Sequence, residues 1–151
     1  MSDEHYLRLA LEQAALAEAL GEVPIGAILV ANGEIIASAH NRTVSDHDPT
    51  AHAEILALRA GGQALGNHRM RGVSLYVTLE PCIMCTGALI QARIDRLVFG
   101  AYDNRIGACG SAFDLARHRR LNHHIREIKG GVLEDECREQ LQRFFQQKRR
   151  G

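Results

Sequence analysis

Hydrophobic and polar positions in the first forty residues follow two different periods. Apolar positions in residues 5–20 recur every three to four residues, which predicts an amphipathic helix that ends at Gly21. The mostly apolar face of this helix is formed by Tyr6, Leu9, Gln13, Leu16 and Leu20. The next segment, "PIGAILVANGEIIASAH" (24–40), contains two strand-like runs around Asn32-Gly33. Because Asn-Gly between apolar runs is a strong hairpin signal, an antiparallel strand pair is predicted here.

Helical and strand-like segments alternate in the rest of the chain. The segment "HDPTAHAEILALRAGG" (47–62) predicts a helix that is capped by Asp48 and carries Pro49 in its first turn. The glycine pair at 61–62 is predicted to end it. The remaining predicted elements are a strand at 73–79, a helix from Pro81 to about Ala92, a strand at 95–102, a possible short helix from Ser111, a weaker strand at 124–130 and a helix at 133–149.

The order of these elements predicts the fold class. Strands that alternate with helices are typical of α/β proteins, in which helices cover both faces of a sheet. The hairpin makes the first strand pair antiparallel, whereas the later β-α-β unit should be parallel and right-handed. We therefore expect one three-layer α-β-α domain over residues 1–151, with a mixed sheet of about five strands.

Composition is ordinary for a folded domain. Apolar residues make up 46% of the 151 positions and charged residues 24%, which fits a single domain with a sizeable core. No apolar run approaches the length needed to span a membrane, and the N-terminus lacks the basic and apolar segments of a secretory signal. We therefore expect a cytoplasmic protein that does not bind membranes.

A formal net charge of zero argues against strong non-specific binding to nucleic acid. The charge is unevenly distributed, however. Residues 1–75 contain 5 Lys/Arg and 9 Asp/Glu, whereas residues 76–151 contain 13 and 9. Basic residues concentrate in "RHRRLNHHIR" (117–126) and "KRR" (148–150). This pattern suits a face that binds an anionic ligand, although from charge alone a solvated surface with a frayed tail is the preferred explanation.

Two of the four cysteines form a Cys-x-x-Cys pair. Cys82 and Cys85 are three positions apart at a predicted helix start, where they share a face and the helix dipole favours thiolate. The pair has three interpretations: two buried apolar residues, a thioredoxin-like redox pair, or half of a zinc site. Cys109 and Cys137 stand alone and are expected to pack as small apolar residues.

A His-x-Glu motif supplies what the zinc interpretation lacks. A helical zinc protease would need a second histidine four positions after His52, where the chain has Leu56. Imidazole and two thiolates form a catalytic zinc set whose fourth position is left to water. His52 and Glu54 can reach one point only in front of the helix end. Taken singly, each is more simply a surface residue, so the case depends on both motifs occurring together.

Together, "HAE" (52–54) and "PCIMC" (81–85) match the His-x-Glu and Pro-Cys-x-x-Cys signature of the zinc nucleobase deaminases. Over nearly its whole length the chain resembles the bacterial tRNA-specific adenosine deaminases of the cytidine/deoxycytidylate deaminase superfamily. The blocks that carry this resemblance are "EVPIGAILV", "HNRT", "HDPTAHAEILALR", "LYVTLEPCIMCTGALI", "VFGAYDNRIGACGS" and "LNHHIREIKGGVLEDEC".

The resemblance implies a cytidine deaminase-like fold and a hydrolase that acts on the C–N bond of an amidine. The implied reaction is deamination of adenosine to inosine at the wobble position of a tRNA anticodon. It implies one Zn²⁺ per subunit, bound by His52, Cys82 and Cys85. Glu54 would carry protons to and from a zinc-activated water. A homodimer that binds an anticodon stem-loop is also implied.

The same resemblance implies the substrate contacts. Asn41 would hydrogen-bond the target base, and the backbone near Pro24 and Ala53 would line the pocket. The implied contacts to the rest of the RNA are Asp103 and Asn104 with neighbouring nucleotides, Phe145 by stacking, and Arg149 with phosphates. Adjacent helical residues point in different directions, so only one of Phe144 and Phe145 is expected in the core, and we assign Phe145 to RNA.

Other functions remain open at this point. The first alternative is a zinc deaminase of a free base or nucleoside, of the guanine or cytidine type. A structural zinc module that binds RNA without catalysis would leave Glu54 unused, and a redox protein would form a reversible disulfide between Cys82 and Cys85. Arg105, Ile106 and Cys109 depart from the residues common in the family, in the segment that would contact the flanking nucleotides.

Overall fold

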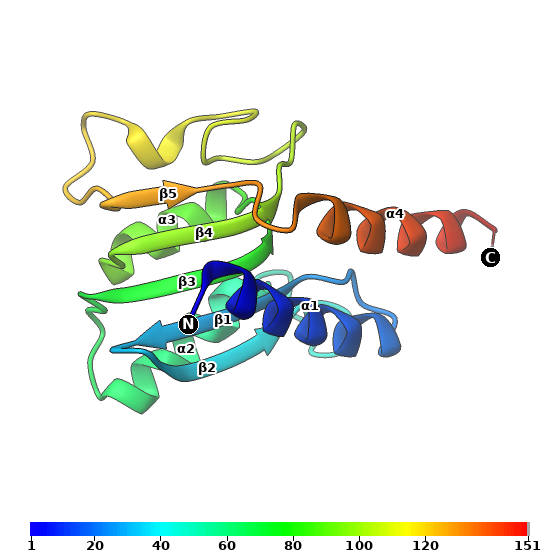
Figure 1. Ribbon diagram of the computed structural model, residues 1–151, viewed down its shortest axis with the longest axis horizontal. Coiled ribbons are helices and arrows are strands. Elements are labelled where there is room, and N and C mark those ends of the chain that lie inside the picture. The colour runs from blue at the N-terminus through cyan, green and yellow to red at the C-terminus, as the bar shows by residue number, and fades with distance from the viewer. Residues whose placement is uncertain (151) are drawn as a thin grey trace.

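A five-stranded sheet forms the centre of the protein, and the computed structural model describes residues 1–150 (Figure 1). The elements are α1 (Asp3–Ala19), β1 (Gly26–Ala31), β2 (Glu34–His40), α2 (Ala53–Leu65), β3 (Val73–Leu79), α3 (Ile83–Ala92), β4 (Arg96–Ala101), a 3₁₀ helix η1 (Leu115–Arg117), β5 (Glu127–Lys129) and α4 (Glu134–Arg150). The strand order is β2-β1-β3-β4-β5. β1 is antiparallel to both neighbours, whereas β3, β4 and β5 are parallel, which confirms the predicted mixed sheet.

The hairpin between β1 and β2 forms where the sequence predicted it. Asn32 and Gly33 both have positive φ angles, 52° and 76°, as the two central residues of a type I′ turn require. The turn therefore sets which residues of the two strands face each other, pairing Ala31 with Glu34.

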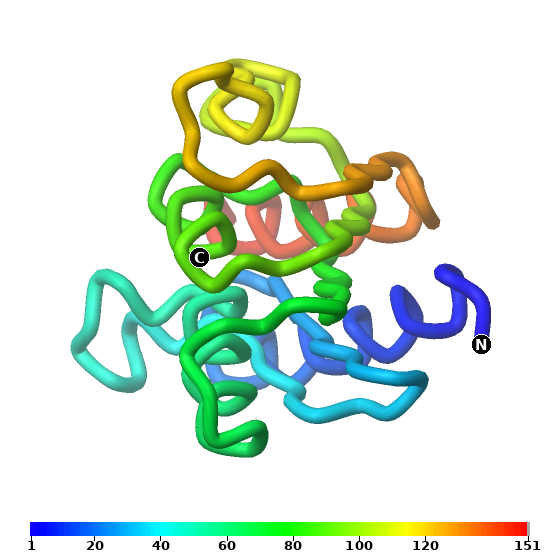
Figure 2. The backbone as a smooth tube through the Cα atoms, turned by 90° about the vertical axis from the view of Figure 1, so that its left-hand side faces the viewer, coloured from blue at the N-terminus to red at the C-terminus, as the bar shows by residue number. Residues whose placement is uncertain are grey.

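Helices cover both faces of the sheet. α1 and α4 lie in front of the strands in Figure 1, and α2 and α3 lie behind them. Figure 2 shows the α2–α3 layer and the N-terminus on opposite sides. Successive side chains of β1 enter two separate cores: Leu29 packs in the cluster that contains Ala53 and Ala57 of α2, and Ile28 packs in the cluster of Tyr6. Because both faces are covered, the central strands read as continuous apolar runs.

The buried face of α1 differs from the predicted one. Its buried residues are Tyr6, Leu7, Ala10, Ala14 and Ala17. Leu16 and Leu20, which were assigned to the buried face, are each 53% exposed. Small residues pack inward because the helix lies against the backbone of β1: a Cβ at Gly26 would come within 2.0 Å of the Ala10 carbonyl oxygen. Close approach of the two backbones therefore selects alanine over leucine.

The predicted ends of α2 are wrong at both termini. The helix begins at Ala53 rather than at Asp48, because Asp48 accepts the Thr50 N–H and hydroxyl and so caps a turn instead. Its end is at Gly66, which adopts the left-handed conformation that commonly stops a helix. Gly61 remains helical because it packs against Leu29, whose Cδ2 would lie 2.3 Å from an added Cβ.

Later elements deviate less. Pro81 lies just before α3 instead of in its first turn, since Cys82 occupies the N-cap. The short helix expected from Ser111 is η1, four residues further along. Within residues 1–150, no helix combines the length and apolar character needed to cross a membrane.

Candidate metal centre and substrate cavity

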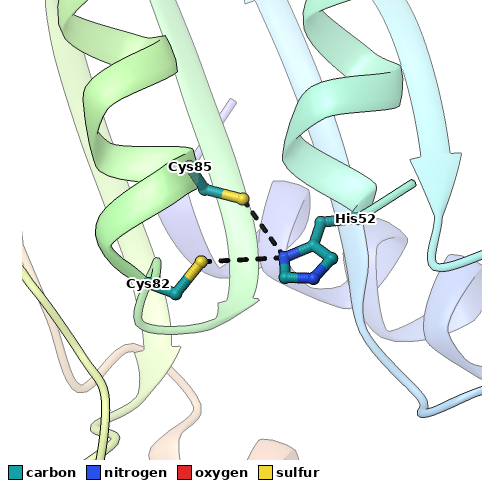
Figure 3. A group of neighbouring side chains, drawn as sticks. All are labelled: His52, Cys82 and Cys85. Carbon is teal, nitrogen blue, oxygen red and sulfur yellow. Dashed lines mark hydrogen bonds between the residues drawn. The ribbon is translucent and has the colours of Figure 1, made fainter. Parts of the chain in front are cut away.

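Three potential ligands converge from two helix N-termini. His52 is the N-cap residue of α2, Cys82 is the N-cap residue of α3, and Cys85 lies in the first turn of α3. The His52 Nδ1 lies 3.7 Å from the Cys82 sulfur and 3.4 Å from the Cys85 sulfur (Figure 3). All three ligand atoms lie within 4.8 Å of one another. The predicted meeting of the two motifs in front of two helix ends is confirmed.

These separations suit one tetrahedral zinc ion. Zinc–sulfur and zinc–nitrogen bonds of about 2.3 and 2.0 Å place sulfur and nitrogen ligands about 3.6 Å apart. Neither N-cap side chain, His52 or Cys82, makes a capping hydrogen bond within the described residues. Both side chains are therefore left to bind a metal, although N-cap side chains commonly accept a backbone N–H.

The two cysteines have pKa values that are shifted in opposite directions. The Cys85 thiol donates to the Cys82 thiolate, which lowers the pKa of Cys82 to about 4. The same interaction, together with burial, raises the pKa of Cys85 far above its ordinary value. Hydrogen bonding with Cys82 raises the pKa of His52. A cation that binds here would find a thiolate already formed.

Glu54 is buried beside the three potential metal ligands. Among residues 1–150, the group whose ligand atoms could share one metal ion does not include Glu54. It is the second residue of α2 and only 4% exposed. Burial raises the pKa of its carboxyl to about 7. A carboxyl with this pKa both accepts and releases a proton near neutral pH, as a general acid–base requires.

Cys109 and Cys137 are buried away from the metal ligands. Cys109 lies in the core with its sulfur 3.4 Å from the Thr86 hydroxyl, and it is not part of the metal-binding group within residues 1–150. Cys137 packs closely on Gly100, where an added Cβ would lie 2.3 Å from its sulfur. Burial raises the pKa of both thiols to about 12. The expectation that both pack as small residues is confirmed.

A cavity of about 600 Å³ opens beside His52. It lies where the parallel strands β3 and β4 end, the edge at which open α/β sheets bind ligands. Its lining consists of Val23, Ile25, Asn41, His52, Leu79, Tyr102, Asp103, Asn104, Arg105, Ile106, Leu141, Gln142 and Phe145. The structure therefore brings Asn41, Asp103, Asn104 and Phe145 together, although they come from three separate segments.

The other predicted contact residues lie close to this cavity. Pro24 and Ala53 are buried, and Pro24 sits between two lining residues. Arg149 lines a second cavity of about 440 Å³, together with Lys148. Three side chains line both cavities: Arg105, Gln142 and Phe145. The two cavities therefore adjoin along one side of α4.

Asn41 is held in a fixed orientation. Its side-chain Oδ1 accepts the Ala53 N–H at 2.8 Å, and its backbone N–H donates to the Ile25 carbonyl at 3.1 Å. Within residues 1–150 the carboxamide NH₂ group makes no hydrogen bond, which leaves its two donors for a ligand. Asn41 thereby connects the cavity to the helix start that carries His52.

The adjacent phenylalanines of α4 separate as expected. Phe144 is 6% exposed, whereas Phe145 is 46% exposed and lines both cavities. Sequence reasoning missed several lining residues, among them Tyr102 and Gln142. Their types give no chemical signal, because apolar and amide side chains become recognisable as cavity walls only when the loops are placed.

Comparison with known proteins gives similarity along nearly the whole chain. The family model described as "Cytidine and deoxycytidylate deaminase zinc-binding region" matches residues 1–101. The tRNA-specific adenosine deaminase of Haemophilus influenzae is 50% identical over 148 residues, which cover 97% of this chain and 85% of that protein.

Two solved structures are also similar. One comes from biochemical and structural studies of A-to-I editing by tRNA:A34 deaminases at the wobble position of transfer RNA. It has a TM-score of 0.87 and 45% identity, covering 91% of this chain and 99% of that chain. The guanine deaminase of Bacillus subtilis has a TM-score of 0.65 and 36% identity, covering 68% of this chain and 66% of that chain.

Proposed function

The chain belongs to the family of the tRNA-specific adenosine deaminases, and we propose that it hydrolytically deaminates adenosine to inosine at the wobble position of a tRNA anticodon. One observation carries the proposal. His52, Cys82 and Cys85 converge beside the buried Glu54, at the mouth of a cavity that also contains Asn41.

The proposed chemistry needs a metal and a proton carrier. His52, Cys82 and Cys85 would hold zinc, which would lower the pKa of a bound water to about 7. Glu54 takes one proton from the attacking water and delivers it to N1 of the adenine, while the water oxygen bonds to C6. Glu54 then takes the second proton from that oxygen and passes it to the N6 amine, and the C6–N6 bond breaks to release ammonia. Burial raises the pKa of the Glu54 carboxyl, which favours its uptake of a proton during the reaction.

The remaining contacts hold an unstacked base and its neighbours. The Asn41 amide donates to the base edge, and the backbone near Pro24 and Ala53 lines the pocket around the base. Phe145 offers an exposed ring for stacking. Asp103 and Asn104 contact the flanking nucleotides, while Lys148, Arg149 and Arg105 meet phosphates along the second cavity.

The alternative substrate is a free base or nucleoside. The similarity to a guanine deaminase supports it. Against it, the adjoining second cavity carries Arg105, Lys148 and Arg149 and has no role for a ligand of one base. A structural zinc site would need four protein ligands. Within residues 1–150 the metal group has three and does not include Cys109, so the fourth coordination position would stay free for water.

We also propose a cytoplasmic homodimer with one deaminase domain spanning residues 1–151. Ile83 and Phe113 are 51% and 48% exposed and line a surface pocket at the start of α3, the helix that carries Cys85. Exposed apolar side chains of this size are typical of subunit contacts. The free Cys82 and Cys85 need a reducing compartment, and tRNA is a cytoplasmic substrate.

An assay on two adenosine sources tests the proposed function. Zinc-loaded protein is incubated with an anticodon stem-loop that carries adenosine at the wobble position, and separately with free adenosine. Inosine is measured by mass spectrometry, with a stem-loop carrying guanosine at that position as the control. We expect inosine from the adenosine stem-loop alone. Deamination of free adenosine at a comparable kcat/KM favours the alternative, and no inosine from either substrate refutes both.

A further inference from the structure

A buried carboxylate outside the metal group holds one loop of the cavity in place. Glu80 is 2% exposed and accepts four hydrogen bonds from residues 103–111. Its Oε1 accepts the Asp103 N–H at 3.0 Å. Its Oε2 accepts the N–H groups of Cys109 at 3.0 Å and Ser111 at 3.1 Å, and the Ser111 hydroxyl donates to Oε1. One side chain thus binds both ends of the loop.

The loop that Glu80 holds forms one wall of the larger cavity. Asp103 accepts the N–H groups of Arg105 and Ile106 through its own Oδ1, at 3.0 and 3.2 Å. These residues, together with Asn104, line the cavity, and Arg105 reaches the second cavity too. The position of Asp103 therefore sets the shape of the wall, and Glu80 sets the position of Asp103.

The same residue connects this wall to the metal ligands. Glu80 is followed directly by Pro81 and Cys82, and the Pro81 carbonyl accepts the Ala108 N–H at 2.9 Å. The loop packs so closely on the carboxylate that a Cβ at Gly107 would lie 2.4 Å from Glu80 Cδ. A buried acceptor for three backbone N–H groups thus adjoins the start of α3.

We propose that Glu80 is a positioning residue for substrate recognition. It holds the wall formed by residues 103–106 at a set distance from Cys82, so that flanking nucleotides bind while the target base reaches the metal. This inference rests on the proposed tRNA substrate. Because the wall contacts nucleotides that do not react, its loss weakens ground-state and transition-state binding equally, which raises KM and leaves kcat almost unchanged.

Glu22 provides a matched control. It is also buried, at 1% exposure, and it accepts the N–H groups of Val44 and Ser45 and the hydroxyls of Ser45 and Thr43. Of the residues that the structure describes, none in the segment 43–45 lines either cavity. The two carboxylates therefore hold loops in the same way, but the loop of Glu80 itself lines the cavities, whereas the segment 43–45 held by Glu22 follows Asn41 without lining either one.

The test compares Glu80→Gln with Glu22→Gln in the zinc-loaded full chain. Whichever way each glutamine amide turns, at least one backbone N–H faces an NH₂ group, so both substitutions disturb their loop. The measurements are zinc per chain, amide hydrogen exchange at Asp103, Cys109 and Ser111, and KM and kcat for the stem-loop. The milder pair Ser111→Ala and Ser45→Ala removes one hydroxyl donor from each carboxylate.

For Glu80→Gln we expect wild-type zinc content, faster exchange at the three amides, and a kcat within about twofold of wild type. KM should rise about 10- to 100-fold through lost uniform binding of the flanking nucleotides. Ser111→Ala should raise KM less, in the same direction, and it decides the question if Glu80→Gln does not fold. Glu22→Gln and Ser45→Ala should leave KM within about twofold.

Three results would overturn the role of Glu80. They are loss of zinc in Glu80→Gln, an equal rise in KM in the two control variants, or an unchanged KM in both Glu80→Gln and Ser111→Ala. Each assumes that the wild-type protein deaminates the stem-loop. A wild-type protein without this activity refutes the proposed function itself, which keeps the two failures distinct.

Discussion

Replacing Glu54 by glutamine separates proton transfer from metal binding. Glutamine has nearly the same volume as glutamate, but it neither gains nor loses a proton at neutral pH. Because His52, Cys82 and Cys85 form the metal group without Glu54, the variant should bind zinc as the wild type does. Loss of general acid–base catalysis should lower kcat about 10²- to 10⁴-fold.

The same substitution should stabilise the metal-free protein. Burial raises the pKa of the Glu54 carboxyl from its ordinary value of 4.5 to about 7. This rise corresponds to about 3 kcal/mol against the ionised form in the folded state. Because the folded pKa is the higher one, the penalty is absent below pH 4.5, grows between pH 4.5 and 7, and is complete above pH 7.

Two measurements check this expectation. Zinc content and kcat with the stem-loop are determined for the loaded variant. The free energy of unfolding of metal-stripped protein is determined in urea at pH 5 and pH 8. We expect Glu54→Gln to gain up to about 3 kcal/mol over the wild type at pH 8 but less than about 1 kcal/mol at pH 5. A variant that turns over normally contradicts the proton-transfer role, and one that loses zinc shows that Glu54 holds the metal.

The remaining predictions concern single side chains. Phe145→Ala should raise KM about 5- to 150-fold through lost stacking and leave stability unchanged. Phe144→Ala removes a buried ring and should lower the free energy of unfolding by about 3–5 kcal/mol. Steady-state kinetics and urea unfolding compare the two variants, and a rise in KM in Phe144→Ala alone would reverse our assignment. Arg149→Ala should reduce the slope of log affinity against log salt by about 1 in a binding titration, and an unchanged slope would remove Arg149 from the phosphate contacts. Hydrogen bonding and ion pairing with Arg96 lower the pKa of Asp3 to about 2. Asp3→Asn should therefore cost about 1 kcal/mol at pH 7, a loss that disappears as pH falls from about 4 to 2; a pH-independent difference in urea unfolding would argue against the pair.

Local chemistry explains which parts of the fold the sequence could predict. The Asn32-Gly33 turn needs two positive φ angles, and few residue pairs other than Asn-Gly supply them. The buried face of α1 was mispredicted, because the close approach of Gly26 favours alanine where periodicity favours leucine. Gly61 was taken as a helix stop for a similar reason: its small size serves packing on Leu29, which only the tertiary structure reveals.

The candidate site shows the same division. The grouping of His52, Cys82 and Cys85 was predictable because zinc chemistry restricts residue types and spacings, so two short motifs identify each other. The catalytic role of Glu54 stays a prediction. Residues of the cavity wall such as Gln142 belong to types found on any surface, and only the packing of α4 beside the loop at 103–106 brings them together. Glu80 was missed for a further reason: a glutamate just before a metal motif has no distinctive pattern, and its four donors come from 23 to 31 residues further along the chain.

Two buried glutamates show how surroundings assign chemistry to one residue type. Burial alone raises the pKa of a carboxyl, and at Glu54 this effect prevails and leaves a pKa of about 7. At Glu22 burial also opposes ionisation, but the donors of Ser45, Val44 and Thr43 outweigh it and lower the pKa. Glu80 likewise accepts several donors, and we propose that it serves as a loop anchor. A buried carboxyl with few donors exchanges its proton near neutral pH, so the number of donors around a buried glutamate distinguishes proton carriers from loop anchors.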